Sequence, residues 1–287
     1  MDDLTRESPA KINLTLRILG RRPDGYHEIE SLVTRVTLSD TVTVTPRREM
    51  RWTLECSEPG VPRDHRNLAL RAVARLAEAV GVRRGVHIAI EKRIPAGAGL
   101  GGGSSNAAAV LMLLNELWEL PLSVQELAQI GARVGSDVPL FFHAPLCILR
   151  GRGEQIEDVD RPFRTAITLF LPQMPSSTRL VYETWDRLRA HPSRPPLPEL
   201  FVQLEQPDAL NAHLFNDLEP AAFAAYPALA MLHRRLEEVC DRAVRLTGSG
   251  SGLYCLGAIK PGVLAAVTSW ADAEIGPIRI QPVLAAH

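Results

Sequence analysis

The stretch that decides the fold reads Pro95-Ala96-Gly97-Ala98-Gly99-Leu100-Gly101-Gly102-Gly103-Ser104-Ser105. Five of the seven residues at 97–103 are glycine, which leaves bare backbone N–H groups. The alanine-rich, apolar stretch at 106–117 follows at once and predicts a buried helix, with Ser104 or Ser105 as its N-cap. Bare N–H groups beside a helix N-terminus form a phosphate site. The stretch therefore predicts phosphate binding rather than a flexible linker.

The residues that flank the glycines exclude several known types of phosphate-binding motif. A Walker A loop needs a Gly-Lys-Ser/Thr sequence, and no lysine follows here. Gly97, Gly99 and Gly102 satisfy the dinucleotide pattern GxGxxG, but so glycine-rich a run matches it almost automatically. That pattern also needs an acidic residue at the end of a second strand about 20 residues on, and Glu116 and Glu119 fall on the predicted helix. The protein-kinase motifs HRD and DFG are also absent.

Outward from the glycines, the chain mixes strands and helices. Residues 10–18 alternate, with Lys11, Asn13 and Thr15 on one face, and predict a half-buried strand. Further strands are expected at 29–38, 41–45, 86–90, 165–171, 244–247, 254–256 and 278–283. Helices are expected at 67–80, from a capping box at 123–126 to about 135, and at 177–190, 227–240 and 261–273. The proline-rich stretch 191–198 predicts a loop. Because strict βαβ alternation is missing, the fold class is α+β.

Composition limits the function classes. The 287 residues carry a formal net charge of −1, which argues against binding nucleic acid by general phosphate attraction. No apolar run approaches the ~20 residues of a membrane span. The N-terminus is polar and acidic, unlike a signal peptide, and the four cysteines are scattered. We therefore expect a cytoplasmic protein, bound neither to nucleic acid nor to a membrane. The basic residues include three lysines only, Lys11, Lys92 and Lys260, which suggests a need for a compact charge where lysine is kept.

Three segments together resemble the motifs of the GHMP small-molecule kinases. They are PAKINL at 9–14, the glycine stretch with Asn106-Ala107-Ala108, and LTGSG at 246–250. Three more segments, RPDGYH at 22–27, GSDVPLFF at 135–142 and RGRGE at 150–154, resemble the members whose acceptor is methylerythritol linked to cytidine diphosphate. The resemblance extends from about residue 9 to about residue 252. It implies a kinase that uses ATP and Mg²⁺ to phosphorylate the 2-hydroxyl of that acceptor.

The resemblance also implies an architecture. The expected two-domain GHMP kinase fold has a ribosomal-protein-S5-like α+β domain at 1–155, which binds ATP. A ferredoxin-like α/β sandwich follows at 156–287, and the active site lies in the cleft between the two domains.

Site residues follow from the same resemblance, position by position. The catalytic pair would be Asp137, as the base, and Lys11, which would orient the reactants and offset developing charge. The residues implied for ATP are Pro95, Ala96, Gly97, Ala98, Gly99, Leu100, Gly101, Gly102, Gly103, Ser104, Ser105, Asn67 and Lys92. Those implied for the acceptor are Asn13, Tyr26, His27, Tyr182, Gly248, Ser249 and Gly250. His27 would read the cytosine and the two tyrosines would sandwich it. The Ser105 hydroxyl is the one protein ligand implied for Mg²⁺, with the phosphates holding most of the ion.

Other functions stay open at this stage. Another GHMP kinase, of the homoserine or mevalonate type, would share the glycine stretch but has no evident use for Tyr26 and His27. A non-catalytic nucleotide-binding module would not need Lys11 or Asp137. A dinucleotide-dependent oxidoreductase fits least. We expect a monomer or a weak homodimer acting on a small molecule.

Overall fold

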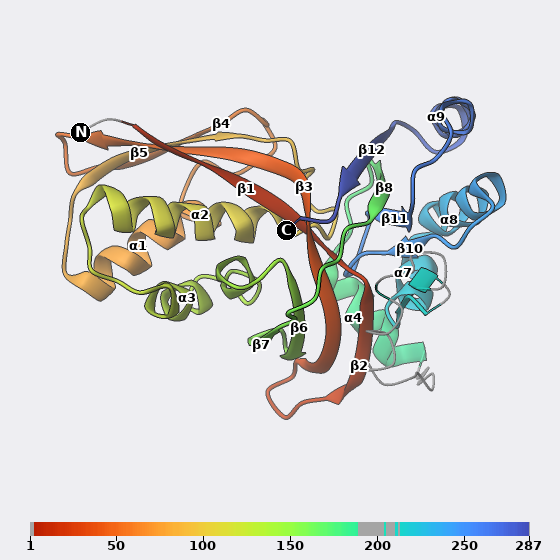
Figure 1. The fold of residues 1–287 in the computed structure, drawn as a ribbon, viewed down its shortest axis with the longest axis horizontal. Coiled ribbons are helices and arrows are strands. Elements are labelled where there is room, and N and C mark those ends of the chain that lie inside the picture. Colours follow the sequence, from red (N-terminus) through yellow and green to blue (C-terminus); the bar gives the residue numbers. More distant parts are fainter. Residues whose placement is uncertain (1–2, 189–203, 205–209, 212, 287) are drawn as a thin grey trace.

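The strands form two sheets in the computed structural model, which describes residues 3–188, 204, 210, 211 and 213–286. The larger sheet has eight strands and the smaller one has four within this part of the chain. Each sheet has its own helices, and the two units lie side by side (Figure 1). The mixed α+β class predicted from the sequence is confirmed.

A single long strand, β3 (His27–Arg47), organises the larger sheet. It pairs with β1 (Leu4–Asn13), β2 (Thr15–Arg21), β5 (Gly85–Glu91) and β6 (Leu146–Gly151). The outer strands are β4 (Trp52–Cys56), β7 (Gln155–Asp158) and β9 (Phe215–Asn216). Two strands were expected where β3 runs as one, because the stretch between them keeps its strand pairing and buries Asp40 among hydrogen-bond donors.

The alternating run at 10–18 differs from its prediction in two ways. The run is divided between β1 and β2, which end and begin on either side of Leu14. Its polar face is also buried, since Lys11, Asn13 and Thr15 expose at most 6% of their surface. The smaller unit covers this face, and the Tyr254 hydroxyl donates to the Asn13 carbonyl at 3.0 Å. The expectation of a half-buried strand is therefore wrong.

Helices cover one face of the larger sheet (Figure 1). They are α1 (Leu68–Val80), α2 (Gly102–Leu117), α3 (Val124–Ala132) and the 3₁₀ turn η1 (Pro139–Phe142). The capping box at the start of α3 is confirmed, because Ser123 and Glu126 each bond to the backbone N–H of the other. The apolar side chains of α1 and α2 pack with those of β3 and β5 into one core. This core holds the start of α2 at a fixed place above the sheet.

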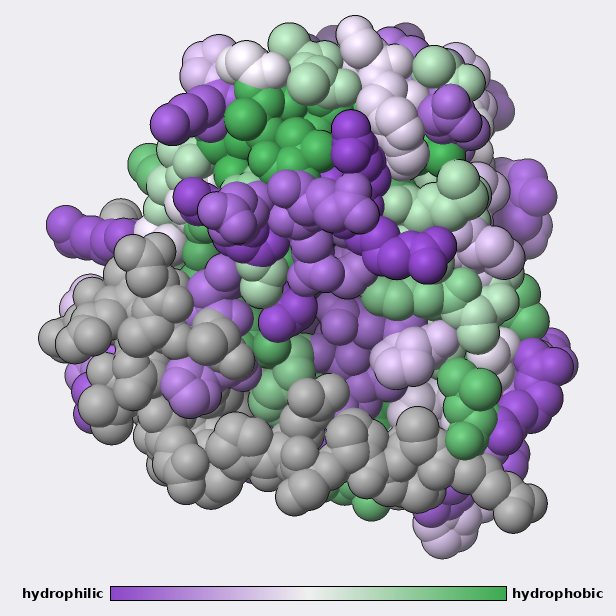
Figure 2. All heavy atoms as spheres, turned by 90° about the vertical axis from the view of Figure 1, so that its right-hand side faces the viewer, coloured by the Kyte–Doolittle hydropathy of each residue, from purple (hydrophilic) through white to green (hydrophobic). Residues whose placement is uncertain are grey.

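The smaller sheet has the order β10-β11-β8-β12 and is antiparallel. Its strands are β8 (Ala166–Pro172), β10 (Arg245–Leu246), β11 (Leu253–Leu256) and β12 (Ile278–Leu284). Its helices are α4 (Thr178–Leu188), α7 (Glu219–Ala225), α8 (Pro227–Cys240) and α9 (Pro261–Glu274). Seen from the side of α8 and α9, hydrophilic side chains form a band across the middle of this face, with apolar side chains above it (Figure 2).

The two sheets exchange elements along the chain. The short strand β9 pairs in parallel with β2 of the larger sheet, and Ala285 forms a bridge with Val36. The expected division at 155/156 falls within β7 and stays a prediction. The proline-rich stretch 191–198 lies outside the described residues.

Candidate active site

Strand β1 presents Lys11 and Asn13 side by side. Their side chains share one face, as the alternation predicted, and Lys11 Nζ donates to Asn13 Oδ1 at 2.7 Å. Asn13 Nδ2 in turn donates to Ser31 Oγ at 2.8 Å. Both residues are buried, so the ammonium is held by packing and by the amide oxygen rather than by water.

Asp137 lies between α3 and η1, in the loop that the sequence marked. Burial lowers the pKa of Lys11 below its usual value of 10.5, and the negative charge of Asp137 partly offsets this. Burial also raises the pKa of Tyr182, with Asp137 as the second cause. The Asp137 carboxylate is half-buried. It influences the pKa of Lys11 in the larger unit and that of Tyr182 in the smaller unit. A carboxylate near a buried cation can supply a general base and a stabilising positive charge.

The glycine stretch enters α2 through left-handed backbone. Gly97, Gly99 and Gly101 have φ angles of 74°, 76° and 70°, which side chains rarely adopt. The N-cap is Gly101 and makes no side-chain cap bond, so the prediction of Ser104 or Ser105 as the cap is wrong. Both serines lie inside the first turn instead. The uncapped first-turn N–H groups of α2 are therefore open to an anion.

Three segments far apart in sequence meet at this loop. Lys11 N donates to the Leu100 carbonyl at 2.9 Å, and Gly252 N donates to the Ala98 carbonyl at 3.0 Å. A Cβ on Gly99 would lie 2.5 Å from the Thr247 carbonyl oxygen. A Cβ on Gly248 would lie 3.6 Å from Lys11 Nζ. The segments at 9–14, 95–105 and 246–252 thus form one site at the junction of the two units.

The loop at 248–250 is held by side chains of the smaller unit. Ser249 Oγ lies 2.8 Å from Thr178 Oγ1, at the start of α4, and the Ser249 carbonyl accepts from Ser176 Oγ at 2.8 Å. Asn216 Nδ2 donates to the Gly248 carbonyl at 2.7 Å. The hydroxyl of Ser249 is therefore engaged within the protein, and the glycines on either side of it are buried.

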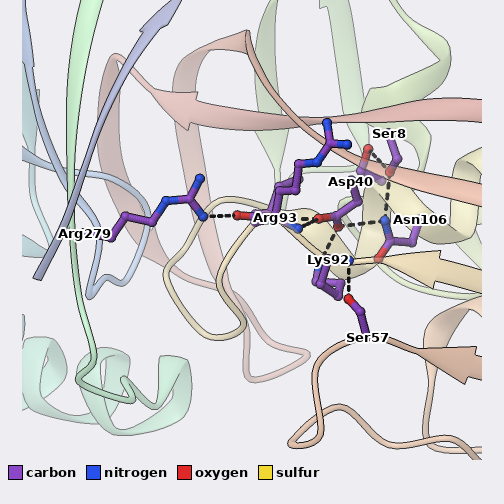
Figure 3. A network of polar contacts seen from close by, with 9 residues as sticks. Ser8, Asp40, Ser57, Lys92, Arg93, Asn106 and Arg279 are labelled. Atoms are coloured by element: carbon purple, nitrogen blue, oxygen red, sulfur yellow. Dashed lines mark hydrogen bonds and ion pairs between the residues drawn. The ribbon is translucent and has the colours of Figure 1, made fainter. Parts of the chain in front are cut away.

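The two residues expected near the adenine both make bonds within the protein. Asn67 caps α1, with Oδ1 accepting from Ala69 N at 2.9 Å. Lys92 forms an ion pair with Asp40 at 2.5 Å (Figure 3). A Cβ on Gly102 would lie 3.1 Å from Lys92 Nζ, so this ammonium is beside the start of α2. Lys92 therefore lies beside the glycine stretch as one half of a buried ion pair with Asp40.

Asp40 is a functional candidate that the sequence analysis missed. It is fully buried and accepts from the backbone N–H groups of Arg93 and Ile94 at 2.7 and 2.8 Å, and from Asn106 Nδ2 at 2.9 Å. These donors come from the segment before the glycines and from α2 (Figure 3). The available signal was an acidic residue within an otherwise alternating strand pattern. Asp40 ties the lysine and the start of α2 to the central strand.

The same network reaches the Mg²⁺ candidate. Ser8 Oγ donates to Ser105 Oγ at 2.8 Å and accepts from Asn106 Nδ2 at 2.9 Å. On the other side, Arg279 of β12 donates to the Arg93 carbonyl at 2.7 Å, so the network spans both units (Figure 3). Within the described residues, no group of three or more His, Cys, Asp or Glu side chains is arranged to hold a metal ion.

The ring side chains expected to bind the cytosine differ in exposure. Tyr26 is 54% exposed, and the Arg152 guanidinium lies 5.1 Å from its ring centroid. His27 is buried, and Tyr182 packs against it at 4.8 Å between ring centroids. His27 Nε2 lies 2.7 Å from Asp186 Oδ1. The sequence analysis overlooked both Arg152 and Asp186, although Arg152 belongs to a quoted motif.

Among the described residues, no helix is both long enough and apolar enough to cross a membrane.

Comparisons with known proteins show which family the chain is similar to. Residues 67–144 match the family described as "GHMP kinases N terminal domain". The 4-diphosphocytidyl-2-C-methyl-D-erythritol kinase of Shouchella clausii is 40% identical over 250 residues, covering 86% of this chain and 84% of the relative. The enzyme of the same name from Salinibacter ruber is 39% identical, covering 88% and 89%.

Solved structures give the same result. A crystal structure of 4-(cytidine 5'-diphospho)-2C-methyl-D-erythritol kinase superposes with a TM-score of 0.80 at 32% identity, covering 99% of this chain and 100% of that one. A homoserine kinase from Cytophaga hutchinsonii has a TM-score of 0.72 at 17% identity, covering 100% and 95%, and shows a shared fold. The GHMP resemblance and fold are confirmed, and the homoserine or mevalonate alternative is not favoured. The chain belongs to the 4-diphosphocytidyl-2-C-methyl-D-erythritol kinase family of the GHMP kinases.

Proposed function

We propose that this chain transfers the γ-phosphoryl group of ATP to the 2-hydroxyl of 4-diphosphocytidyl-2-C-methyl-D-erythritol. The products are the 2-phosphate and ADP, in the non-mevalonate route to isopentenyl diphosphate in the cytoplasm. One observation supports this most directly. The buried Lys11 ammonium lies within the electrostatic reach of Asp137 and beside the uncapped glycine stretch. The function of the named relatives supports the choice of acceptor.

The glycine stretch binds the ATP phosphates. The N–H groups of the first turn of α2 carry a partial positive charge and have no side-chain cap. Lys92 lies beside Gly102, with its ammonium paired to the buried Asp40 carboxylate. Asn67 and Lys92 flank the adenine side of this site in our proposal. The domain that binds ATP spans 1–155 and the second domain spans 156–287.

The oxygen of the 2-hydroxyl attacks the γ-phosphorus, and Asp137 accepts the proton that this hydroxyl loses. Phosphoryl transfer depends mainly on positioning and on stabilising the charge of the equatorial oxygens. Lys11 supplies that charge from a buried position where water screens it little. Asn13 holds the ammonium and orients it toward the junction with Gly248.

Mg²⁺ would arrive bound to the phosphates and neutralise part of their charge. The phosphates would hold most of the ion, because the described residues include no cluster of carboxylates for a separate metal site and the Ser105 hydroxyl in the first turn of α2 is almost fully buried. Ser105 Oγ already accepts from Ser8, so Ser105 would hold the ion through its remaining lone pair.

The cytidine end of the acceptor binds at Tyr26, His27 and Tyr182. Tyr26 offers an exposed ring for stacking, and Tyr182 lies against the His27 imidazole. The loop at 248–250 closes the methylerythritol end. Its packing against Gly99 brings that end next to the phosphates.

The test is ADP release with MgATP and, in parallel, the cytidylated methylerythritol, homoserine and mevalonate. We expect release with the cytidylated acceptor only. Asp137→Asn should abolish turnover while both substrates still bind. Asp160→Asn, which changes an exposed aspartate outside the proposed site, is the control and should behave as the wild type. Near-normal turnover by Asp137→Asn would remove Asp137 as the base, and release with another acceptor would overturn the cytidine assignment.

A further inference from the structure

Asp186 is a carboxylate that the chemistry proposed above does not use. It lies on α4, and its Oδ1 is 2.7 Å from Nε2 of His27 on β3. The side chain of His27 is only 7% exposed, and that of Asp186 is 30% exposed. The bond therefore joins the two units at a largely buried point.

This bond determines which ring nitrogen of His27 carries the proton. An ionised carboxylate can only accept hydrogen bonds, so Nε2 must be the donor. In the neutral imidazole, Nδ1 is then left with its lone pair and acts as an acceptor. Arg21 Nη1 lies 3.8 Å from the other oxygen of Asp186, which leaves Oδ1 for the imidazole.

The ring is also held in one orientation. Tyr182 packs against it with a 30° interplanar angle, and Trp185 meets it edge-on at 5.4 Å and 85°. Within the part of the chain that the structure describes, no group bonds to Nδ1 of His27. The site thus offers one oriented acceptor that has no partner among these residues.

We propose that Asp186 is a positioning residue that sets the His27 tautomer and thereby selects cytosine over uracil. Cytosine carries an amino group at position 4, which donates to Nδ1. Uracil carries a carbonyl oxygen there, and its lone pairs face the lone pair of Nδ1. A site that is built to bond an N–H group discriminates strongly against the analogue that lacks it. This inference rests on the proposed function, and in particular on the assignment of His27 to the base.

The experiment compares two acceptors, methylerythritol linked to cytidine diphosphate and to uridine diphosphate. The variants are Asp186→Asn and Asp186→Ala. The matched control is Glu183→Gln, which changes an exposed carboxylate on the same helix that pairs with Arg179. We expect the wild type to prefer the cytidine compound in kcat/KM by roughly 100-fold or more. Both Asp186 variants should lose about tenfold or more of that preference. The loss should appear in the acceptor KM, with the KM for ATP and kcat nearly unchanged.

A second measurement reads the tautomer directly. The ¹⁵N spectrum of the His27 ring in the full-length protein should show Nε2 protonated and Nδ1 bare. Asp186→Asn should shift this population toward the other tautomer, because the Asn amide can donate to Nε2. Glu183→Gln should leave the spectrum as it is.

The outcomes separate this inference from the function on which it rests. A wild type that phosphorylates the cytidine compound, with Asp186 variants that lose stability but keep the base preference, would make Asp186 a structural ion pair only. A wild type with Nδ1 protonated would also overturn the inference, even if no variant folds. A wild type inactive on the cytidine compound would overturn the proposed function instead.

Discussion

Gly99→Ala tests the close approach between the glycine stretch and the loop at 246–250. The φ angle of Gly99 is 76°, and a Cβ there would lie 2.5 Å from the Thr247 carbonyl oxygen and 3.2 Å from that of Gly250. Both of those atoms are backbone, so neither can rotate away. The substitution must therefore push the two segments apart.

Gly97→Ala is the matched control, because it measures the free-energy cost of placing alanine in left-handed backbone without any steric clash. Its φ angle is 74°, and nothing lies within 4 Å of an added Cβ. Left-handed backbone costs a residue with a side chain about 1–2 kcal/mol in both variants. The overpacking at Gly99 adds about 1–3 kcal/mol to this. We expect about 1–2 kcal/mol of destabilisation for Gly97→Ala and about 2–5 kcal/mol for Gly99→Ala.

The assay is urea denaturation of each variant, and the free energies of unfolding are compared with one shared m-value. The KM for ATP is measured alongside. Gly99→Ala should also raise this KM more than Gly97→Ala does, because it displaces the loop that we propose binds the phosphates. Equal free energies of unfolding for the two variants would refute the close packing of Gly99 on Thr247.

Three other changes probe the rest of the site. Tyr26→Ala should weaken acceptor binding by about 1–3 kcal/mol and leave ATP binding intact, as measured by calorimetry, and unchanged affinity would defeat the stacking assignment. Asp40→Ala should destabilise the fold by about 3–5 kcal/mol, because it leaves Lys92 buried and unpaired, and the double change with Lys92→Met should recover part of this in denaturation. Because burial lowers the pKa of Lys11, activity should be present below that pKa and be lost as the pH rises through it, at a pH below 10.5. Lys11→Arg, which stays charged, should have low kcat without this alkaline loss, and an identical pH profile for the two proteins would argue against the Lys11 assignment.

The local elements were largely predictable. Amphipathic periodicity located most helices and strands, and the capping box at Ser123 was a strong local signal. Errors arose where a neighbouring unit changed the environment. The polar face of β1 is buried because the smaller unit covers it, and the cap of α2 is Gly101 because the chain enters the helix through a left-handed turn.

The sequence by itself determined the family, the position of the glycine stretch directly before a buried helix and the placement of Lys11 and Asn13 on one strand face. These follow from local spacing, because strand and helix periods are properties of the backbone. The tertiary structure decided which distant groups meet. Asp186 lies 159 positions from His27 and Asp40 lies 52 from Lys92, and no periodicity links residues at such separations. Those contacts form only when the two units pack their apolar faces together. Buried charged groups meet their partners only in that packed state.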